Sequence, residues 1–209
     1  MAKLVMNEEE TMLADMARGF LDDACPVSKL REMRDAGVTS DAATWKEMAD
    51  LGWAGVLVPE EAGGSDMGFA AANVIAHEMG KTLAVSPFIS SAVIAATALR
   101  QVNDARALGA LAKIASGDVT YALAVDEGIK FDPEGVQMEA KADGNGFRLN
   151  GKKQFVVDGA GADRLLVLAR TADGLTLFDI PADRAGVNCD ASNMIDARDA
   201  ARITFEDVE

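Results

Sequence analysis

The spacing of apolar residues changes once along this 209-residue chain, near residue 117. Before that point apolar residues recur three or four positions apart, as at Leu13, Met16 and Phe20, which is the pattern of one helix face. After it, short apolar runs and alternating patterns predominate, and these are typical of strands. The change predicts an α+β protein, with an all-α domain over residues 1–116 and a small antiparallel β-barrel domain over residues 117–209.

In the first domain, helix starts are marked by residues whose side chains can accept hydrogen bonds from free backbone N–H groups. Asn7, with a glutamate three positions later, forms a potential capping box. Asp41 and Asp104 are expected to cap two further helices. Ser86 followed by Pro87 is the expected start of another helix, because proline suits the first helical position.

The second domain consists of alternating segments separated by turn signals. Residues 143–146 read DGNG and residues 150–151 read NG, and both are expected to be hairpin turns. The reason is that Asn and Gly accept the positive φ that tight hairpin turns require. Strands are expected over residues 121–125, 136–140, 147–149, 154–157, 165–169, 175–180 and 202–205.

Charge and composition argue against several classes of function. The sequence has 20 Lys and Arg against 34 Asp and Glu, a net charge of −14, which disfavours a nucleic-acid-binding surface. No apolar run approaches the ~18–20 residues of a membrane span, and residues 1–10 lack the apolar core of a secretory signal. Cys25 and Cys189 show no metal-ligand spacing, so we expect two buried thiols, no metal site and a cytoplasmic location.

Single residues do not identify an enzyme. His77 lies on an expected helix over residues 67–79 without a nearby His or Cys partner, which indicates a surface or packing histidine. Residues 159–161 read GAG but lack the third glycine and the following helix of a dinucleotide-binding motif. Lys152 and Lys153, at the expected hairpin tip, could meet a phosphate, although lysines in turns are usually only solvated.

Longer motifs are more specific. Residues 51–64 read LGWAGVLVPEEAGG, which resembles the LGW-x-G-x-x-VPEE-x-GG segment of the acyl-CoA dehydrogenase family. Residues 146–153 read GFRLNGKK, which is similar to that family's G-[FY]-x-LNG-x-K hairpin. Residues 159–171 and 205–208 resemble the segments that follow in the family, so the resemblance covers nearly the whole chain.

The resemblance implies a flavoprotein that binds FAD and oxidises an acyl-CoA thioester between Cα and Cβ. In the family, a glutamate removes the α-proton while the β-hydrogen leaves as hydride to flavin N5. Flavin ribityl and backbone donors polarise the thioester carbonyl and so make the α-proton acidic, and the flavin accepts the electrons. The implied partners are an acyl-CoA substrate from fatty acid or steroid side-chain β-oxidation and an electron-transfer flavoprotein or similar acceptor.

The chain departs from the family pattern in three places. Family members continue into a C-terminal helical bundle that carries the glutamate base, and this chain stops before it, so no catalytic residue is assigned. The loop [VL]-T-E-P-G-A-G-S-D reads VDEGIK over residues 125–130. The strand W-[IV]-[TS]-N reads FVVD over residues 155–158. Without the bundle, apolar faces would be exposed, so we expect a homo- or hetero-oligomer.

The resemblance places the flavin against two segments. Phe155 can still pack against an isoalloxazine ring, whereas Val157 has lost the hydroxyl of the family residue. Asp126 replaces a neutral threonine near the flavin pyrimidine edge, and an ionised carboxylate ~5 Å from reduced flavin costs about 3 kcal/mol at an effective dielectric of ~20. These changes predict a degenerate flavin site. The expected cofactor-binding residues are Leu123, Val125, Asp126, Phe155, Val156 and Val157.

Two functions therefore stay open. One is an acyl-CoA dehydrogenase represented by its first two domains. The other is a non-catalytic or flavin-degenerate partner subunit of a heteromeric acyl-CoA dehydrogenase. A third possibility uses the same fold as an oxidase or flavin monooxygenase, because access of oxygen to the reduced flavin is not readable from sequence.

Overall fold

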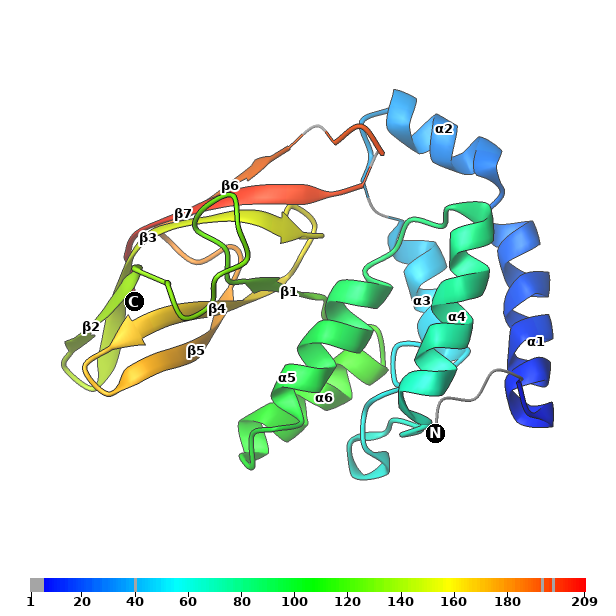
Figure 1. Ribbon diagram of the computed structural model, residues 1–209, viewed down its shortest axis with the longest axis horizontal. Coiled ribbons are helices and arrows are strands. Elements are labelled where there is room, and N and C mark those ends of the chain that lie inside the picture. Colours follow the sequence, from blue (N-terminus) through cyan, green and yellow to red (C-terminus); the bar gives the residue numbers. More distant parts are fainter. Residues whose placement is uncertain (1–5, 40, 193, 197) are drawn as a thin grey trace. The chain divides into compact units, whose positions relative to one another are not determined.

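The computed structural model describes residues 6–39, 41–192, 194–196 and 198–209. The chain divides into two compact units between Asp118 and Val119. The first unit is helical and the second is a sheet, so the expected α+β class is confirmed (Figure 1).

Three helices of the helical unit begin directly after the capping residues that the sequence predicts. Asn7 accepts from the Glu10 N–H at 2.7 Å and its own N–H is bound by the Glu10 carboxylate, which completes the capping box. Asp41 and Asp104 also cap their helices. The elements are α1 (Glu8–Ala24), α2 (Val27–Asp35), α3 (Ala42–Asp50), η1 (Glu60–Ala62), α4 (Gly68–Thr82), η2 (Phe88–Ala95), α5 (Ala96–Leu99) and α6 (Ala105–Ala115).

The helix expected after Ser86 differs in kind. It begins at Phe88 and its first eight residues, η2, are π-helical before α5 continues the chain. The expected placement is wrong by one residue, because Pro87 and not Ser86 is the N-cap; Ser86 Oγ accepts from the Phe88 N–H at 3.3 Å.

The segment over residues 51–64 is a tightly packed turn in the helical unit. Within this segment Trp53 is buried, and its ring contacts the Phe20 ring edge-on, with ring centroids 5.3 Å apart. Gly64 lies directly against Val58: a Cβ added at Gly64 would overlap the Val58 carbonyl oxygen and come within 2.5 Å of Val58 Cβ. The Gly64 N–H is bonded to the Pro59 carbonyl at 3.1 Å. Packing therefore explains the glycine at position 64 of this motif.

The sheet unit is a curled, mixed sheet with strand order β1-β4-β2-β3-β7-β6, and β5 paired to β4 (Figure 1). The expectation of an antiparallel sheet is corrected at two pairings, because β4 runs parallel to β1 and also to β2, where Glu139 faces Arg170. The loop after β1 and the β2–β3 hairpin intervene before β4, so the chain re-enters the sheet in the same direction. The strands are β1 (Tyr121–Ala124), β2 (Glu139–Asp143), β3 (Gly146–Val157), β4 (Arg164–Thr171), β5 (Gly174–Pro181), β6 (Val187–Ala191) and β7 (Ala200–Val208).

One of the two expected hairpin turns is present. Gly144, with φ of +60°, lies in the turn between β2 and β3. The expected turn at Asn150 and Gly151 is wrong, because β3 runs through both residues. The register of β3 against β7 shifts there, and the Asn150 side chain accepts from the Asp207 N–H at 2.9 Å. The Asn-Gly pair forms an irregularity within a long strand, which joins two strands expected to be separate.

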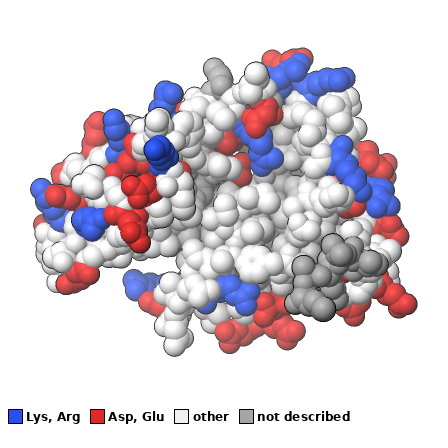
Figure 2. Space-filling view, viewed as in Figure 1, with Lys and Arg blue, Asp and Glu red and all other residues white. Residues whose placement is uncertain are grey.

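On the face drawn in Figure 2, Lys and Arg side chains lie among Asp and Glu side chains. Among the described helices, none is both long and apolar enough to cross a bilayer. The described residues also contain no cluster of three or more His, Cys, Asp or Glu that could hold a metal ion.

Candidate functional site

The structure brings together the two segments expected to meet a cofactor. One is the end of β1 with the two residues that follow it, and the other is the end of β3. The Gln154 N–H donates to the Asp126 carbonyl at 2.7 Å, which joins them directly. We refer to these segments, Leu123–Asp126 and Gln154–Val157, as the β1–β3 edge.

A bulge in β3 determines which side chains of this edge face outward. The register against β7 shifts between Lys153 and Val156, and Phe155 has a positive φ of 52°. A bulge bends its strand and re-aims a side chain. As a result Phe155 and Val157 are 54% and 41% exposed, while Val156 is 1% exposed in the sheet core. The edge thus presents an aromatic ring and a branched side chain, with Val156 supplying only backbone.

In the first segment, Leu123 on β1 is partly buried, and of the two residues after β1, Val125 is buried and Asp126 is partly exposed. The Asp126 Oδ1 atom is buried and has no hydrogen-bond partner among the described residues. The exposed Phe155 ring and an unused carboxylate acceptor are the kinds of group that can hold a flat heterocycle bearing an N–H group, such as oxidised flavin. A carboxylate at this position would disfavour negative charge on a bound, reduced flavin.

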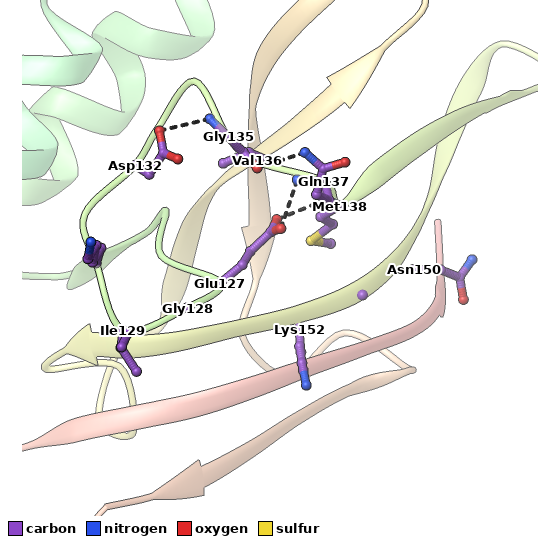
Figure 3. A pocket seen from close by; sticks show the side chains of 12 residues that line it. Glu127, Gly128, Ile129, Asp132, Gly135, Val136, Gln137, Met138, Asn150 and Lys152 are labelled. Atoms are coloured by element: carbon purple, nitrogen blue, oxygen red, sulfur yellow. Dashed lines mark hydrogen bonds between the residues drawn. The ribbon is translucent and has the colours of Figure 1, made fainter.

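Glu127, the next residue, closes the loop that follows β1. Its carboxylate accepts from the backbone N–H groups of Gln137 at 2.8 Å and Met138 at 3.0 Å (Figure 3). It also accepts from Lys153 Nζ at 2.8 Å. Burial opposes its charge, but the bonds from Lys153 and from the two N–H groups outweigh burial and hold the pKa of Glu127 below its ordinary value. The charged Glu127 side chain therefore joins the start of the loop to its end.

Lys153 corrects an expectation from the sequence. The sequence predicts it at an exposed hairpin tip, but its side chain is fully buried and donates to the Val125 carbonyl at 3.1 Å as well as to Glu127. Burial lowers the pKa of Lys153 despite its acidic partner. Because β3 is continuous, period-two alternation places Lys153 on the same face as buried Leu149, and Lys152 on the exposed face.

The loop over residues 127–138 surrounds an open cavity of about 660 Å³ (Figure 3). Lys130 and Lys152 contribute to its lining together with the apolar side chains of Ile129, Val136 and Met138. None of the expected cofactor residues lines this cavity, which begins one residue beyond Asp126. The sequence marks the loop that surrounds this cavity only by a departure from the family pattern after β1, over residues 125–130.

The remaining candidate residues belong to other elements or serve structural roles. His77 is exposed on α4, in agreement with a surface histidine. Cys25 is buried, but Cys189 is exposed, so the expectation of two buried thiols is wrong for Cys189. The turn over residues 159–161 is held by Asp199, which accepts backbone N–H groups of that turn at 2.9 and 3.3 Å.

Comparison with known families gives two matches that together cover most of the chain. Residues 7–118 match the model of the acyl-CoA dehydrogenase N-terminal domain. Residues 122–208 match the model of the acyl-CoA dehydrogenase middle domain. The chain is 28% identical over 176 residues to the acyl-CoA dehydrogenase FadE27 of Mycobacterium tuberculosis, an alignment that covers 84% of this chain and 46% of that protein.

Solved structures show the same fold. The Tcur3481-Tcur3483 steroid ACAD G363A variant is 31% identical, with a TM-score of 0.87, and the match covers 96% of this chain and 55% of that chain. A glutaryl-CoA dehydrogenase from Mycobacterium smegmatis, solved in complex with FADH2, is 21% identical with a TM-score of 0.85, covering 97% and 54% of the two chains. The chain spans about half the length of these relatives.

Proposed function

This chain belongs to the acyl-CoA dehydrogenase family, and we propose that it forms the helical and sheet units of an FAD-dependent protein acting on acyl-CoA thioesters. The observation that carries the proposal is the β1–β3 edge. A backbone hydrogen bond joins its two segments, and a bulge turns the Phe155 ring outward at their junction.

When bound, FAD would supply the acceptor for hydride from the acyl Cβ. The chain's own part is to bind and orient. Phe155 offers an exposed ring for stacking, and Val157 a surface that excludes water. Val125 and Val156 are buried and keep the edge rigid beneath these groups. We assign no catalytic base among the described residues, so proton abstraction is left outside this proposal.

A second candidate function is a flavin-degenerate partner subunit of a heteromeric acyl-CoA dehydrogenase. Asp126 favours it, because its charge disfavours the reduced cofactor that turnover requires. The named pair in the related steroid structure is consistent with a two-component assembly. An electron-transfer flavoprotein as acceptor, β-oxidation of a fatty acid or steroid side chain, and a cytoplasmic location complete the proposal.

The two functions separate in a flavin-binding experiment. The purified chain is titrated with FAD, and binding is followed by flavin fluorescence and by the visible absorbance of the retained cofactor. Stoichiometric binding with a shifted spectrum supports the dehydrogenase. Weak, substoichiometric binding that becomes complete only in the reconstituted hetero-oligomer supports the partner subunit. Absence of binding in both preparations contradicts both functions.

A further inference from the structure

The sheet unit contains an ion pair between the buried Lys153 and the partly exposed Glu127, which the proposed flavin contacts do not include. Lys153 Nζ and Glu127 Oε1 are 2.8 Å apart, and the Lys153 side chain has no exposed surface. A buried ammonium group is costly unless a charged partner and further hydrogen bonds compensate for lost water. Here those further bonds go to the backbone: Lys153 bonds to Val125, and Glu127 bonds to Gln137 and Met138.

These bonds connect three separate segments at one point. Val125 directly follows β1, Lys153 is in β3, and Gln137 and Met138 are at the far end of the loop, just before β2. Glu127 therefore ties both ends of the loop over residues 127–138 together, and Lys153 ties that junction to β3. Figure 3 shows the Glu127 carboxylate directed across the loop toward the backbone of residues 137 and 138.

The same junction adjoins the β1–β3 edge. Asp126 lies between the two residues that the Lys153 ammonium group contacts. Gln154, next to Lys153, bonds through its backbone N–H to Asp126 and through its side-chain amide to the Glu127 carbonyl at 2.7 Å. The backbone on either side of Asp126 is thus held at Val125 and at Glu127. Its position relative to Phe155 therefore depends on contacts made by Lys153 and by its neighbour Gln154.

We propose that Glu127 and Lys153 are a positioning pair that holds the β1–β3 edge and its loop in the shape that binds flavin. Neither residue is assigned a contact with the cofactor. This inference rests on the proposed function, because it concerns the affinity of the same edge for FAD. It adds that this affinity depends on an ion pair, with its lysine buried, that is hydrogen-bonded to the edge.

The test compares two neighbouring lysines. Lys153→Met removes the buried charge and keeps most of the side-chain volume, while Lys152→Met removes an exposed charge from the adjacent position. Amide hydrogen exchange over residues 127–138 is measured without ligand, and the Kd for FAD and the visible circular dichroism of bound flavin are measured separately. We expect Lys153→Met to speed exchange in the loop roughly tenfold or more and to weaken FAD binding by a similar factor. Lys152→Met should change neither.

A third variant covers the case in which Lys153→Met does not fold. In Glu127→Gln/Lys153→Met no lone charge is buried, and the side-chain amide oxygen introduced at position 127 can still accept the two loop N–H groups, so loop protection should recover in part. Its flavin dichroism should move back toward the wild-type signal. A merely structural contribution to stability would leave that signal unchanged in every folded variant.

The inference is overturned if Lys153→Met, or the double variant where the single one does not fold, matches Lys152→Met in loop exchange and in FAD affinity. It is also overturned if loop exchange rises while FAD affinity and dichroism stay at wild-type values. A wild-type chain that binds no FAD contradicts the proposed function. In that case the exchange comparison alone decides whether the pair holds the loop.

Discussion

The turn over residues 51–64 and the β1–β3 edge differ in what their side chains do, although both belong to segments that resemble one family. In the turn, small and apolar residues are explained by packing, as Gly64 against Val58 and Trp53 against Phe20 show. At the edge, the backbone bond between Gln154 and Asp126 is present, while the side chains that face outward depart from the family pattern.

The comparison shows that a residue can match or depart from the family pattern for two different reasons. A residue in a packed turn is restricted by its own neighbours, so its identity follows from the fold. A residue on an exposed edge is restricted by what binds there, so its identity can change while the backbone keeps its course. Substitutions should therefore alter stability in the turn and ligand affinity at the edge.

The largest effect is expected in the turn. Gly64→Ala places a Cβ against the Val58 carbonyl oxygen, so the backbone must shift, and we expect a loss of about 3 kcal/mol or more in the free energy of unfolding. Urea unfolding followed by far-UV circular dichroism measures it. Gly63→Ala is the control: its φ is +79° but nothing lies within 4 Å of an added Cβ, so only about 1 kcal/mol should be lost. Equal losses would refute the packing explanation.

At the edge, the corresponding change should act on the ligand. Asp126→Thr removes a negative charge beside the proposed flavin position, which should stabilise the reduced cofactor. We expect the two-electron midpoint potential of bound FAD to rise by about 30–60 mV, with little change in unfolding free energy. Spectroelectrochemical titration of the FAD-loaded protein measures it.

The matched control for that experiment is Glu134→Gln, which removes an exposed charge from the loop over residues 127–138 that follows Asp126. Its midpoint potential should equal that of the wild type. An Asp126→Thr variant whose potential also equals the wild-type value would show that this carboxylate does not face the flavin.

The smallest effect concerns a charge in the helical unit that acts on stability alone. The hydrogen bond from Lys29, followed by that from Thr44, lowers the pKa of Asp41 from 3.8 to about 2. Because the folded-state pKa is depressed, the carboxylate stabilises the fold above about pH 4, and this contribution is lost as the pH falls through 2. After allowance for partial exposure it is about 1 kcal/mol.

Asp41→Asn tests this contribution, since asparagine keeps the N-cap acceptor but loses the charge. The wild type should be more stable than Asp41→Asn by about 1 kcal/mol near neutral pH, and the two should converge below pH 2. Urea midpoints across this range provide the measurement. A difference that does not depend on pH would assign the effect to the cap and not to the charge.

Local signals predicted the elements that depend on local interactions. Asn7, Asp41 and Asp104 bind N–H groups within a few residues of themselves, so their caps are readable from sequence. The Asn150–Gly151 signal failed because pairing of β3 with β7, more than fifty residues away, outweighed the local preference for a turn. The expected exposure of Lys153 failed with it.

The sequence by itself determined the change from helices to strands, the acidic charge and the two segments that resemble a flavin-binding family. Periodicity and motifs are properties of neighbouring residues, and they survive without knowledge of the fold. Only the tertiary structure decided that β1 pairs parallel to β4, that a bulge turns Phe155 outward, and that Lys153 is buried against Glu127. Each of these features depends on contacts between residues distant in sequence, and burial determines how much free energy those contacts cost or contribute.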